Sequence, residues 1–537
     1  MTRKLPLLTV AVLIIIACIL TAGCTTTTTA TTTTTPSPVA VNTNGTVKNE
    51  AMNIIGLRSD GVDKFLGIPF AEPPVGDLRF APPIAKEPWT ETLDCTKARN
   101  ASLQGRVFIG DDVPISEDCL YLNVWKPSNA KEGDKLPVYV WIHGGGWCYG
   151  LGSDTDCDGT PFARDGVIVV TLNYRLGALG YLALDTLMEE YGTAGNWATL
   201  DQICALQWVH DNIAKFGGDP DNVTIGGESA GSFNTFALIM SPKAEGLFNK
   251  AILESGTLTY ILENQMRLDK AIEIGKNFAK QFGANDSKEG LEILRKADPM
   301  MLWNMSEINI NDFITGSKYQ MYPVYDGSVL PLNEPYQALV NGIYNKNISV
   351  LIGNDGAEAV SFVNPDTLTE ESFNAFIKKS FRKDSYQKVI DYYAAQTDRP
   401  LLEKACELLD MTLITLGVIE VENQFSKAGV PLYVYEFNYF DSYGLAPVHA
   451  LEVPYAFGQE VNEVHLPFNG DDFKVRDIMH AYWKNFIKTG NPNGAGLLEW
   501  PKYVEGTKSI MELNTEPQLI NRSFKELNDF LNPLYFR

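Results

Sequence analysis

Ser229 stands in the sequence pattern of an activated nucleophile. Residues 223–225 are rich in β-branched side chains, Gly-Glu-Ser-Ala-Gly follows at 227–231, and an apolar periodic segment begins at Phe233. Strand, sharp turn and helix in this order strain the backbone of the serine and lift its hydroxyl above the sheet, at the positive end of the helix. The pattern predicts catalysis through a covalent intermediate on Ser229.

A serine nucleophile needs a histidine to take its proton, and with this type of turn the histidine follows the serine in the chain. Of the five histidines, His449, His465 and His480 follow Ser229. His480 lies in a helical pattern and His465 in an acidic, irregular stretch. His449 comes a short loop after a strand-like run at 432–437. Catalytic groups of open α/β sheets lie beyond the carboxyl ends of strands, so we expect His449 to be the base.

The carboxylate that orients the histidine is expected between the serine and the histidine in the chain. Residues 349–353 read as a buried strand, and Asp355 and Glu358 follow it. Either side chain would stand at the carboxyl end of that strand. Position alone does not choose between them.

Acyl transfer also needs donors for the negative charge that develops on the carbonyl oxygen. An apolar strand at 138–142 runs into His-Gly-Gly-Gly-Trp at 143–147, a loop type that supplies backbone N–H groups. The residue after the nucleophile, Ala230, is expected to give a further N–H. We expect His143 itself to brace the loop rather than take part in the chemistry.

These motifs resemble the type-B carboxylesterases, the cholinesterase-like branch of the α/β-hydrolases. The turn around Ser229 fits the serine signature of that family, and residues 117–127 fit a second signature. The likeness covers nearly everything from about residue 40 onward. It implies an α/β-hydrolase fold in a single domain, residues 40–537, with a mostly parallel twisted sheet and helices on both faces. The strands are expected to end at Ile142, Leu172, Ile225, Leu253, Gly353 and Phe437.

The resemblance also assigns roles to site residues. Family members hold the acid five residues after the strand-end glycine, which selects Glu358 over Asp355. Glu228, beside the nucleophile, is similar to a buried glutamate of the family that supports the catalytic groups. The oxyanion donors of the family fall on Gly145, Gly146 and Ala230.

Several structural pairs follow from the same resemblance. Cys95 and Cys119 match the loop-closing disulfide of the family. A local bridge between Cys148 and Cys157 is plausible from their spacing, without support from the family pattern. Two ion pairs are expected to be structural, namely Arg79 with Glu117 and Arg175 with Asp201.

The substrate expected from the resemblance is a small-molecule carboxylic ester with an uncharged leaving group. Cholinesterases bind the quaternary ammonium through a tryptophan in the first disulfide loop. Between Cys95 and Cys119 this chain has no tryptophan, and Phe108 is the only aromatic residue in that interval. The pocket walls are expected from residues 255–330, where aromatic residues cluster. No cofactor or metal is expected, because no Cys/His spacing suggests zinc.

The N-terminus reads as a processing segment. Residues 1–23 resemble a prokaryotic lipoprotein signal, with Cys24 as the lipidated residue, and residues 24–39 form a threonine-rich tether expected to be disordered. We therefore expect an exported protein whose membrane contact is this lipid anchor. The net charge of −22 argues against nucleic acid as a partner. The oligomeric state is open.

The reaction predicted from the sequence is hydrolysis of a carboxylic ester through an acyl-enzyme. The same machinery also suits thioesters and amides. A different class of function, non-catalytic adhesion at the cell surface, is also found on this fold, but such proteins often lack a member of the triad. Since all the members are present here, the sequence favours the enzyme.

Overall fold

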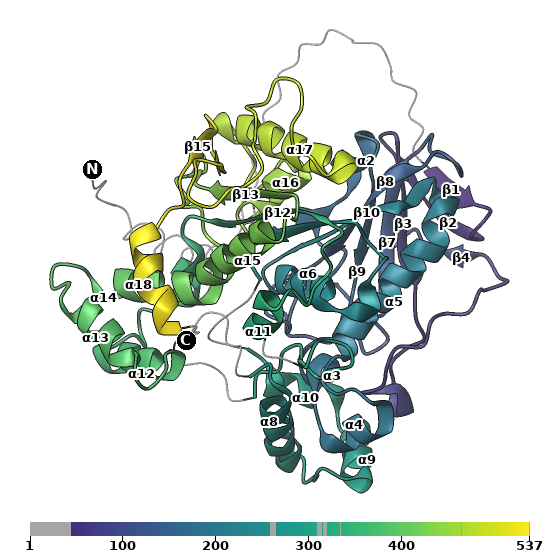
Figure 1. The fold of residues 1–537 in the computed structure, drawn as a ribbon. Coiled ribbons are helices and arrows are strands. Elements are labelled where there is room, and N and C mark those ends of the chain that lie inside the picture. The colour runs from purple at the N-terminus through teal and green to yellow at the C-terminus, as the bar shows by residue number, and fades with distance from the viewer. Residues whose placement is uncertain are drawn as a thin grey trace, which may run out of the picture.

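The chain folds around one large twisted sheet (Figure 1). The computed structural model describes residues 45–535 except 258–264, 309–313, 315–318, 333–334 and 463. The expected signal segment, Cys24 and the tether therefore lie outside the described residues. The strand order is β1-β2-β3-β7-β9-β8-β10-β11-β12-β13-β14-β15, and β4 (Leu93–Asp94) pairs with β2.

The centre of the sheet is parallel, as predicted. All six expected strands are present. They are β8 (Leu136–Ile142), β9 (Ile168–Leu172), β10 (Gly218–Glu228), β11 (Lys250–Glu254), β12 (Ser349–Asp355) and β13 (Leu432–Phe437). Three of them, β8, β9 and β13, end at the predicted residue, β11 and β12 end within two residues of it, and β10 continues three residues beyond Ile225 to Glu228. These strands pair in parallel, so their carboxyl ends share one edge of the sheet.

Antiparallel strands close both sides of the sheet. An antiparallel meander lies on one side of the parallel centre, and a short antiparallel hairpin lies on the other. The meander holds β1 (Gly45–Asn49), β2 (Ile54–Ser59), β3 (Val62–Pro69) and β7 (Tyr121–Pro127), and the hairpin holds β14 (Ile510–Leu513) and β15 (Gln518–Ile520).

Helices cover both faces of the sheet because successive side chains of its strands point alternately into two apolar cores. Val140 of β8 belongs to one core and its neighbours Tyr139 and Trp141 to the other. Side chains in a strand point to opposite faces in turn, and both faces here are apolar, as expected for a parallel sheet. One core is covered by α5 (Trp197–Asn212), α6 (Ala230–Met240) and α15 (Leu416–Lys427), the other by α2 (Thr160–Arg164), α16 (Val453–Phe457) and α17 (Asp471–Thr489).

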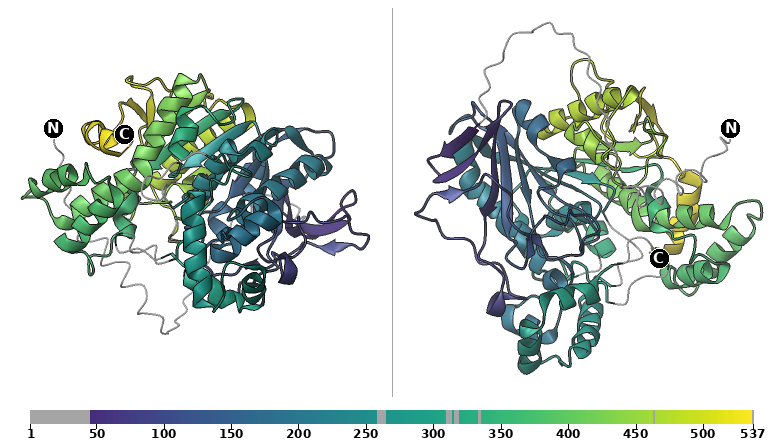
Figure 2. Two further views of the ribbon diagram at one scale, coloured as in Figure 1. Left: turned by 60° about the horizontal axis from the view of Figure 1, so that its bottom comes forward. Right: turned by 180° about the vertical axis from the view of Figure 1, so that it is seen from behind.

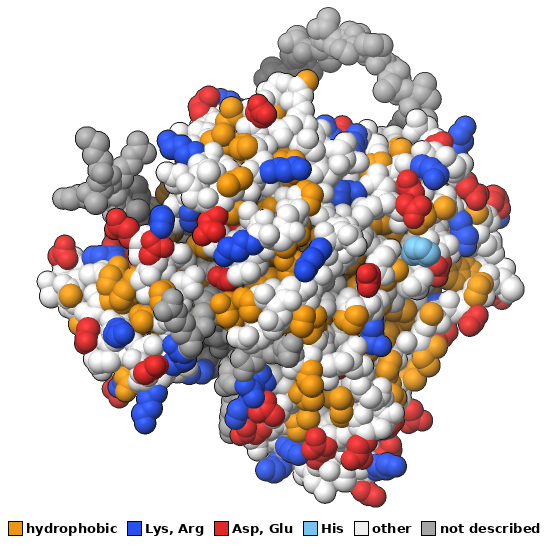
Figure 3. Space-filling view, in the orientation of Figure 1, with side chains coloured by type: hydrophobic (Ala, Val, Ile, Leu, Met, Phe, Trp, Pro, Cys, Tyr) orange, Lys and Arg blue, Asp and Glu red, His pale blue; other side chains and the backbone are white. Residues whose placement is uncertain are grey.

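Two groups of helices extend beyond the sheet (Figures 1 and 2). One group holds α8 (Leu268–Gln281), α9 (Lys288–Lys296) and α10 (Pro299–Ser306), and the other holds α12 (Glu370–Ser380), α13 (Tyr386–Ala394) and α14 (Leu401–Asp410). Among the described helices, none combines the length and apolar character that a membrane span requires. Acidic and basic side chains are interspersed on the face shown in Figure 3.

The expected ion pairs are present, but the expected disulfide is not. Cys95 and Cys119 are both buried free thiols. The backbone of Cys95 pairs with Ile55 and Leu66, and the Cys119 thiol interacts with the Ser102 side chain instead of forming a bridge. Burial raises the pKa of each thiol to about 12. Cys148 and Cys157 are free as well, while Arg79–Glu117 and Arg175–Asp201 approach to 2.6 and 2.7 Å.

The close packing around the turn between β10 and α6 predicts that a side chain at position 231 destabilises the fold. A Cβ built there would lie 2.0 Å from the carbonyl oxygen of Ile142. Gly231→Ala therefore forces α6 away from β8, and we expect it to lower the free energy of unfolding by about 3 kcal/mol in urea titrations. Gly45→Ala is the control, since nothing lies within 4 Å of a Cβ there. Equal unfolding midpoints for the two variants would contradict this packing.

Candidate active site

Ser229 occupies a strained turn between β10 and α6. Its backbone angles are φ 56° and ψ −127°, outside the regions that most residues adopt. The Ser229 N–H donates to the carbonyl of Glu254 at 3.0 Å, which ties the turn to β11. The Ser229 carbonyl accepts from Phe233 N at 2.9 Å. The sequence pattern thus predicted the local backbone correctly.

Glu358 and His449 come together beyond the ends of β12 and β13. His449 Nδ1 lies 2.5 Å from Glu358 Oε2, and the two side chains are 9% and 1% exposed. The other Glu358 oxygen accepts from Asp355 N at 2.7 Å. The carboxyl of Asp355 faces that of Glu452 instead of the histidine. Of the two carboxylates that position alone left open, Glu358 is the one in contact with His449.

The second nitrogen of His449 faces Glu228. His449 Nε2 lies 3.0 Å from Glu228 Oε1, although the two are not aligned as a hydrogen bond. The Ser229 hydroxyl, next in the chain to Glu228, has no hydrogen-bond partner within the described part of the chain. Catalytic hydrogen bonds are often long or misaligned before substrate binds.

Charges around the imidazole favour its protonated form. Burial by itself lowers the pKa of His449, but the carboxylates of Glu228 and Glu358 outweigh burial and hold it well above the ordinary value. Burial raises the pKa of Glu228, and the attraction of His449 opposes that rise. An imidazolium formed at this position is therefore well stabilised.

The glycine loop after β8 lies against the serine turn. A Cβ built on Gly144 would lie 3.1 Å from Ser229 Cβ. Gly145 has φ 97° and Gly146 φ 61°. Over the described residues, the N–H groups of Gly145, Gly146 and Ala230 donate to no backbone carbonyl. They remain available for a developing oxyanion.

His143 braces this loop, as the sequence suggests. Its ring stacks on Tyr174 with the centroids 4.4 Å apart, and Nδ1 lies 2.9 Å from the carbonyl oxygen of Gly144. The hydroxyl of Tyr174 donates to the carbonyl of His143 at 2.8 Å. Burial lowers the pKa of His143 to about 4, so the ring is neutral at neutral pH.

The other two candidate histidines contact different acidic residues. His480 on α17 is satisfied by the Ala456 carbonyl at 2.9 Å and by Asp165 Oδ2 at 3.2 Å. The His465 side chain is 64% exposed and lies 3.6 Å from Asp156 Oδ1. His465 borders the same cavity as the serine without belonging to the Glu358–His449 contact.

A cavity of about 560 Å³ opens above Ser229. Its described walls come from several separate segments, and none of the described residues within 255–330 lines it, which differs from the sequence expectation. The aromatic residues Trp303, Tyr322 and Tyr325 are instead buried in the core. Besides Ser229, His449 and the glycine loop, the walls include Val107, Phe108, Ile109, Leu151, Phe233, Phe362, Leu413, Ile414 and Val453.

Sequence reasoning missed two of these contributions. Leu413 and Ile414 lie in a π-helical segment, Met411–Thr415, between α14 and α15. The residue before it, Asp410, accepts a hydrogen bond from the N–H of Ala359, directly after Glu358. A π-helical turn often marks a functional site, but no turn residue or change of periodicity announces it in the sequence.

The arrangement suits attack on an acyl carbon. A hydroxyl on a strained turn, an imidazole backed by a buried carboxylate and three free N–H groups line one largely apolar cavity. The hydroxyl supplies the nucleophile, the imidazole moves its proton, and the amides stabilise negative charge on oxygen.

Comparisons with known proteins agree with this chemistry. A model described as the carboxylesterase family matches residues 36–530. Para-nitrobenzyl esterase of Bacillus subtilis (strain 168) is 34% identical, over 91% of this chain and 99% of its own. The medium-chain fatty acyl-CoA hydrolase precursor of Anas platyrhynchos is 34% identical, over 96% of this chain and 94% of its own. A solved PNB esterase structure superposes with a TM-score of 0.77 at 32% identity, covering 89% of this chain and 97% of that one.

Glu228→Gln tests the electrostatics at Nε2. The variant removes one of the two carboxylates that raise the pKa of His449 while keeping the side-chain size. We expect the pKa of His449 to fall, because only Glu358 then favours the imidazolium. NMR titration of the five histidine rings against pH measures it. The exposed substitution Glu505→Gln is the control, and a His449 pKa that stays unchanged or rises in Glu228→Gln would contradict the arrangement.

Proposed function

Because the chain belongs to the carboxylesterase family and is a carboxylic ester hydrolase, we propose that Ser229, His449 and Glu358 form its catalytic triad. The observation that carries the proposal is the 2.5 Å contact of Glu358 Oε2 with His449 Nδ1, in the wall of the cavity that Ser229 also lines. A carboxylate at Nδ1 fixes the tautomer that leaves Nε2 free to accept a proton.

The reaction begins with the proton of the Ser229 hydroxyl. His449 Nε2 takes this proton while the serine oxygen attacks the ester carbonyl carbon, and a tetrahedral intermediate forms. Glu358 stabilises the resulting imidazolium. Glu228, 3.0 Å from Nε2, adds negative charge at the other ring nitrogen and favours the same ion.

The negative oxygen of the intermediate is held by backbone amides. We assign this role to the N–H groups of Gly145, Gly146 and Ala230, each worth on the order of 3 kcal/mol of transition-state stabilisation. The intermediate then collapses, and the alcohol leaves with the proton from His449. A water molecule, activated by the same histidine, releases the acid from Ser229.

The cavity favours an ester with apolar groups on both sides of the carbonyl. Its walls carry aromatic and aliphatic side chains from six regions of the chain. One of them is Phe108, 51% exposed, which lies between Cys95 and Cys119 in the sequence, the interval in which cholinesterases carry a tryptophan. We propose small-molecule carboxylic esters with an uncharged leaving group as the substrate class.

Thioesters are the second candidate substrates. The relative from Anas platyrhynchos is named a fatty acyl-CoA hydrolase, and acyl-CoA is a thioester. The same nucleophile and oxyanion site suit a thioester carbonyl, since only the leaving atom differs.

We also propose that the protein is exported and anchored to the membrane by lipid on Cys24. The support is the N-terminal sequence alone, a basic start, an apolar stretch and small residues before Cys24, followed by the threonine-rich tether. Stable anchoring requires more than one acyl chain.

Ser229→Ala provides the test of the proposed function. We expect the kcat for p-nitrophenyl butyrate to fall at least about 10³-fold, because no other group then forms the acyl-enzyme. The control is Ser232→Ala on the same helix, whose hydroxyl bonds the Gly256 carbonyl and not the substrate. We expect it to keep most of the activity.

Turnover that survives in Ser229→Ala would overturn the assignment of the nucleophile. The absence of turnover on any ester by the wild-type protein would favour the non-catalytic adhesion function. Matched butyryl ester and thioester substrates, compared by kcat/KM, rank the two substrate classes.

A further inference from the structure

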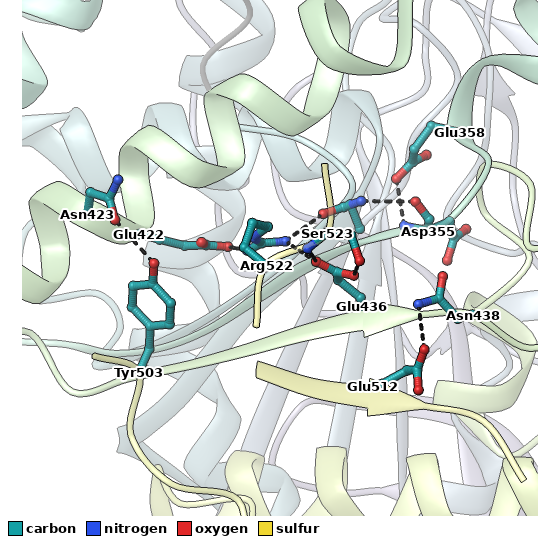
Figure 4. Close-up of polar contacts among 11 residues, drawn as sticks. Asp355, Glu358, Glu422, Asn423, Glu436, Asn438, Tyr503, Glu512, Arg522 and Ser523 are labelled. Carbon is teal, nitrogen blue, oxygen red and sulfur yellow. Dashed lines mark hydrogen bonds and ion pairs between the residues drawn. The ribbon is translucent and has the colours of Figure 1, made fainter. Parts of the chain in front are cut away.

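A buried ionic cluster lies beside the strands that carry the triad. Arg522, just after β15, has a side chain that is 10% exposed. Its guanidinium contacts Glu422 of α15 and Glu436 of β13, the latter at 3.1 Å. Ser523 donates its N–H to Glu436 at 3.0 Å. Figure 4 shows these side chains in a row that leads toward Asp355 and Glu358.

Hydrogen bonds connect this cluster to the triad acid. Arg522 Nη1 donates to Asn354 Oδ1 at 3.4 Å, and Asn354 Nδ2 donates to the Asp355 carbonyl at 2.9 Å. The Asp355 N–H donates to Glu358 Oε1 at 2.7 Å, and Glu358 Oε2 holds His449. Asn354 and Glu436 are also direct partners in the β12–β13 register. The connection therefore runs across adjacent strands.

The guanidinium fixes the orientation of the Asn354 side-chain amide in this series of hydrogen bonds. Arginine offers only donors, so the Asn354 amide must turn its oxygen toward Arg522 and its NH₂ group toward the Asp355 carbonyl. With the amide in the opposite direction, two donors would face each other at one end and two acceptors at the other. Arg522 thus orients the Asn354 amide, which holds the carbonyl of Asp355, the residue whose N–H supports Glu358 Oε1.

The cluster is costly for stability alone. Two glutamates share one arginine, and burial raises the pKa of Glu422 to about 7 although Arg522 opposes that rise. Apolar side chains of similar volume often replace buried ion pairs without loss of stability. Arg522 Nε and Glu422 Oε2 are moreover buried without a hydrogen-bond partner among the described residues, which adds to that cost.

We propose that Arg522 is a positioning residue of the triad, which holds the Glu358 carboxylate against His449 through Asn354 and the Asp355 backbone. Arg522 itself touches neither substrate nor the reacting atoms. The proposal rests on the triad assigned above.

Two variants test the connection at different points. Arg522→Lys keeps the charge but loses the planar fork that reaches Glu422, Glu436 and Asn354 together. Asn354→Ala cuts the connection to Asp355 and leaves the ion pairs of Arg522 intact. For both we expect kcat on p-nitrophenyl butyrate to fall about tenfold with KM within about twofold, because a small misplacement of a catalytic group slows chemistry more than binding.

Arg295→Lys is the matched control. The Arg295 side chain is also 10% exposed and pairs with a glutamate, Glu190, but it lies on α9 away from the triad. We expect unchanged kcat in this variant. Thermal melting of all three variants shows whether each is folded, and Asn354→Ala keeps the test valid if Arg522→Lys does not fold.

A double-mutant cycle separates positioning from general stability. In a Glu358→Gln background the carboxylate to be positioned is gone, so we expect Asn354→Ala to cost less than about twofold in kcat. The same tenfold loss in both backgrounds, or an unchanged kcat in folded Asn354→Ala, would overturn the role of Arg522. Either result would leave the proposed function intact as long as activity still depends on Ser229.

Discussion

The strained turn at Ser229 is the constraint on which the rest of the site depends. The left-handed backbone of a non-glycine residue is held in place because β10 and α6 approach β8 very closely, and Gly227 and Gly231 leave room for the Ile142 carbonyl. Strain of this kind persists only where the surrounding structure enforces it. The same contact brings the loop after Ile142 beside the serine, so this packing positions both the proposed nucleophile and the proposed oxyanion donors.

The parallel sheet brings the remaining residues of the site together. The glycine loop, Ser229, Glu358 and His449 follow β8, β10, β12 and β13, whose carboxyl ends share one edge of the sheet. Residues that are more than two hundred positions apart in the chain therefore lie close together at this edge of the sheet. The buried carboxylates there give the histidine a field that favours its charged form.

Much of this architecture was readable from the sequence, and the exceptions have physical reasons. The strand ends and the serine turn follow from local apolar runs and glycines. Asp355 and Glu358 could not be separated by position, because β12 continues through Asp355 and only the turn after it brings Glu358 to His449. The cavity walls and the free thiols of Cys95 and Cys119 depend on tertiary contacts between distant segments, for which no local pattern exists.

Covalent labelling of the nucleophile tests the central claim most directly. Diethyl p-nitrophenyl phosphate mimics an ester and leaves a stable phosphoryl group on an activated serine. Mass spectrometry of the digested protein is predicted to find one diethylphosphoryl group per chain, on the peptide that contains Ser229, with p-nitrophenolate released in equal amount. A label at any other residue, or no label while ester hydrolysis proceeds, would contradict the account.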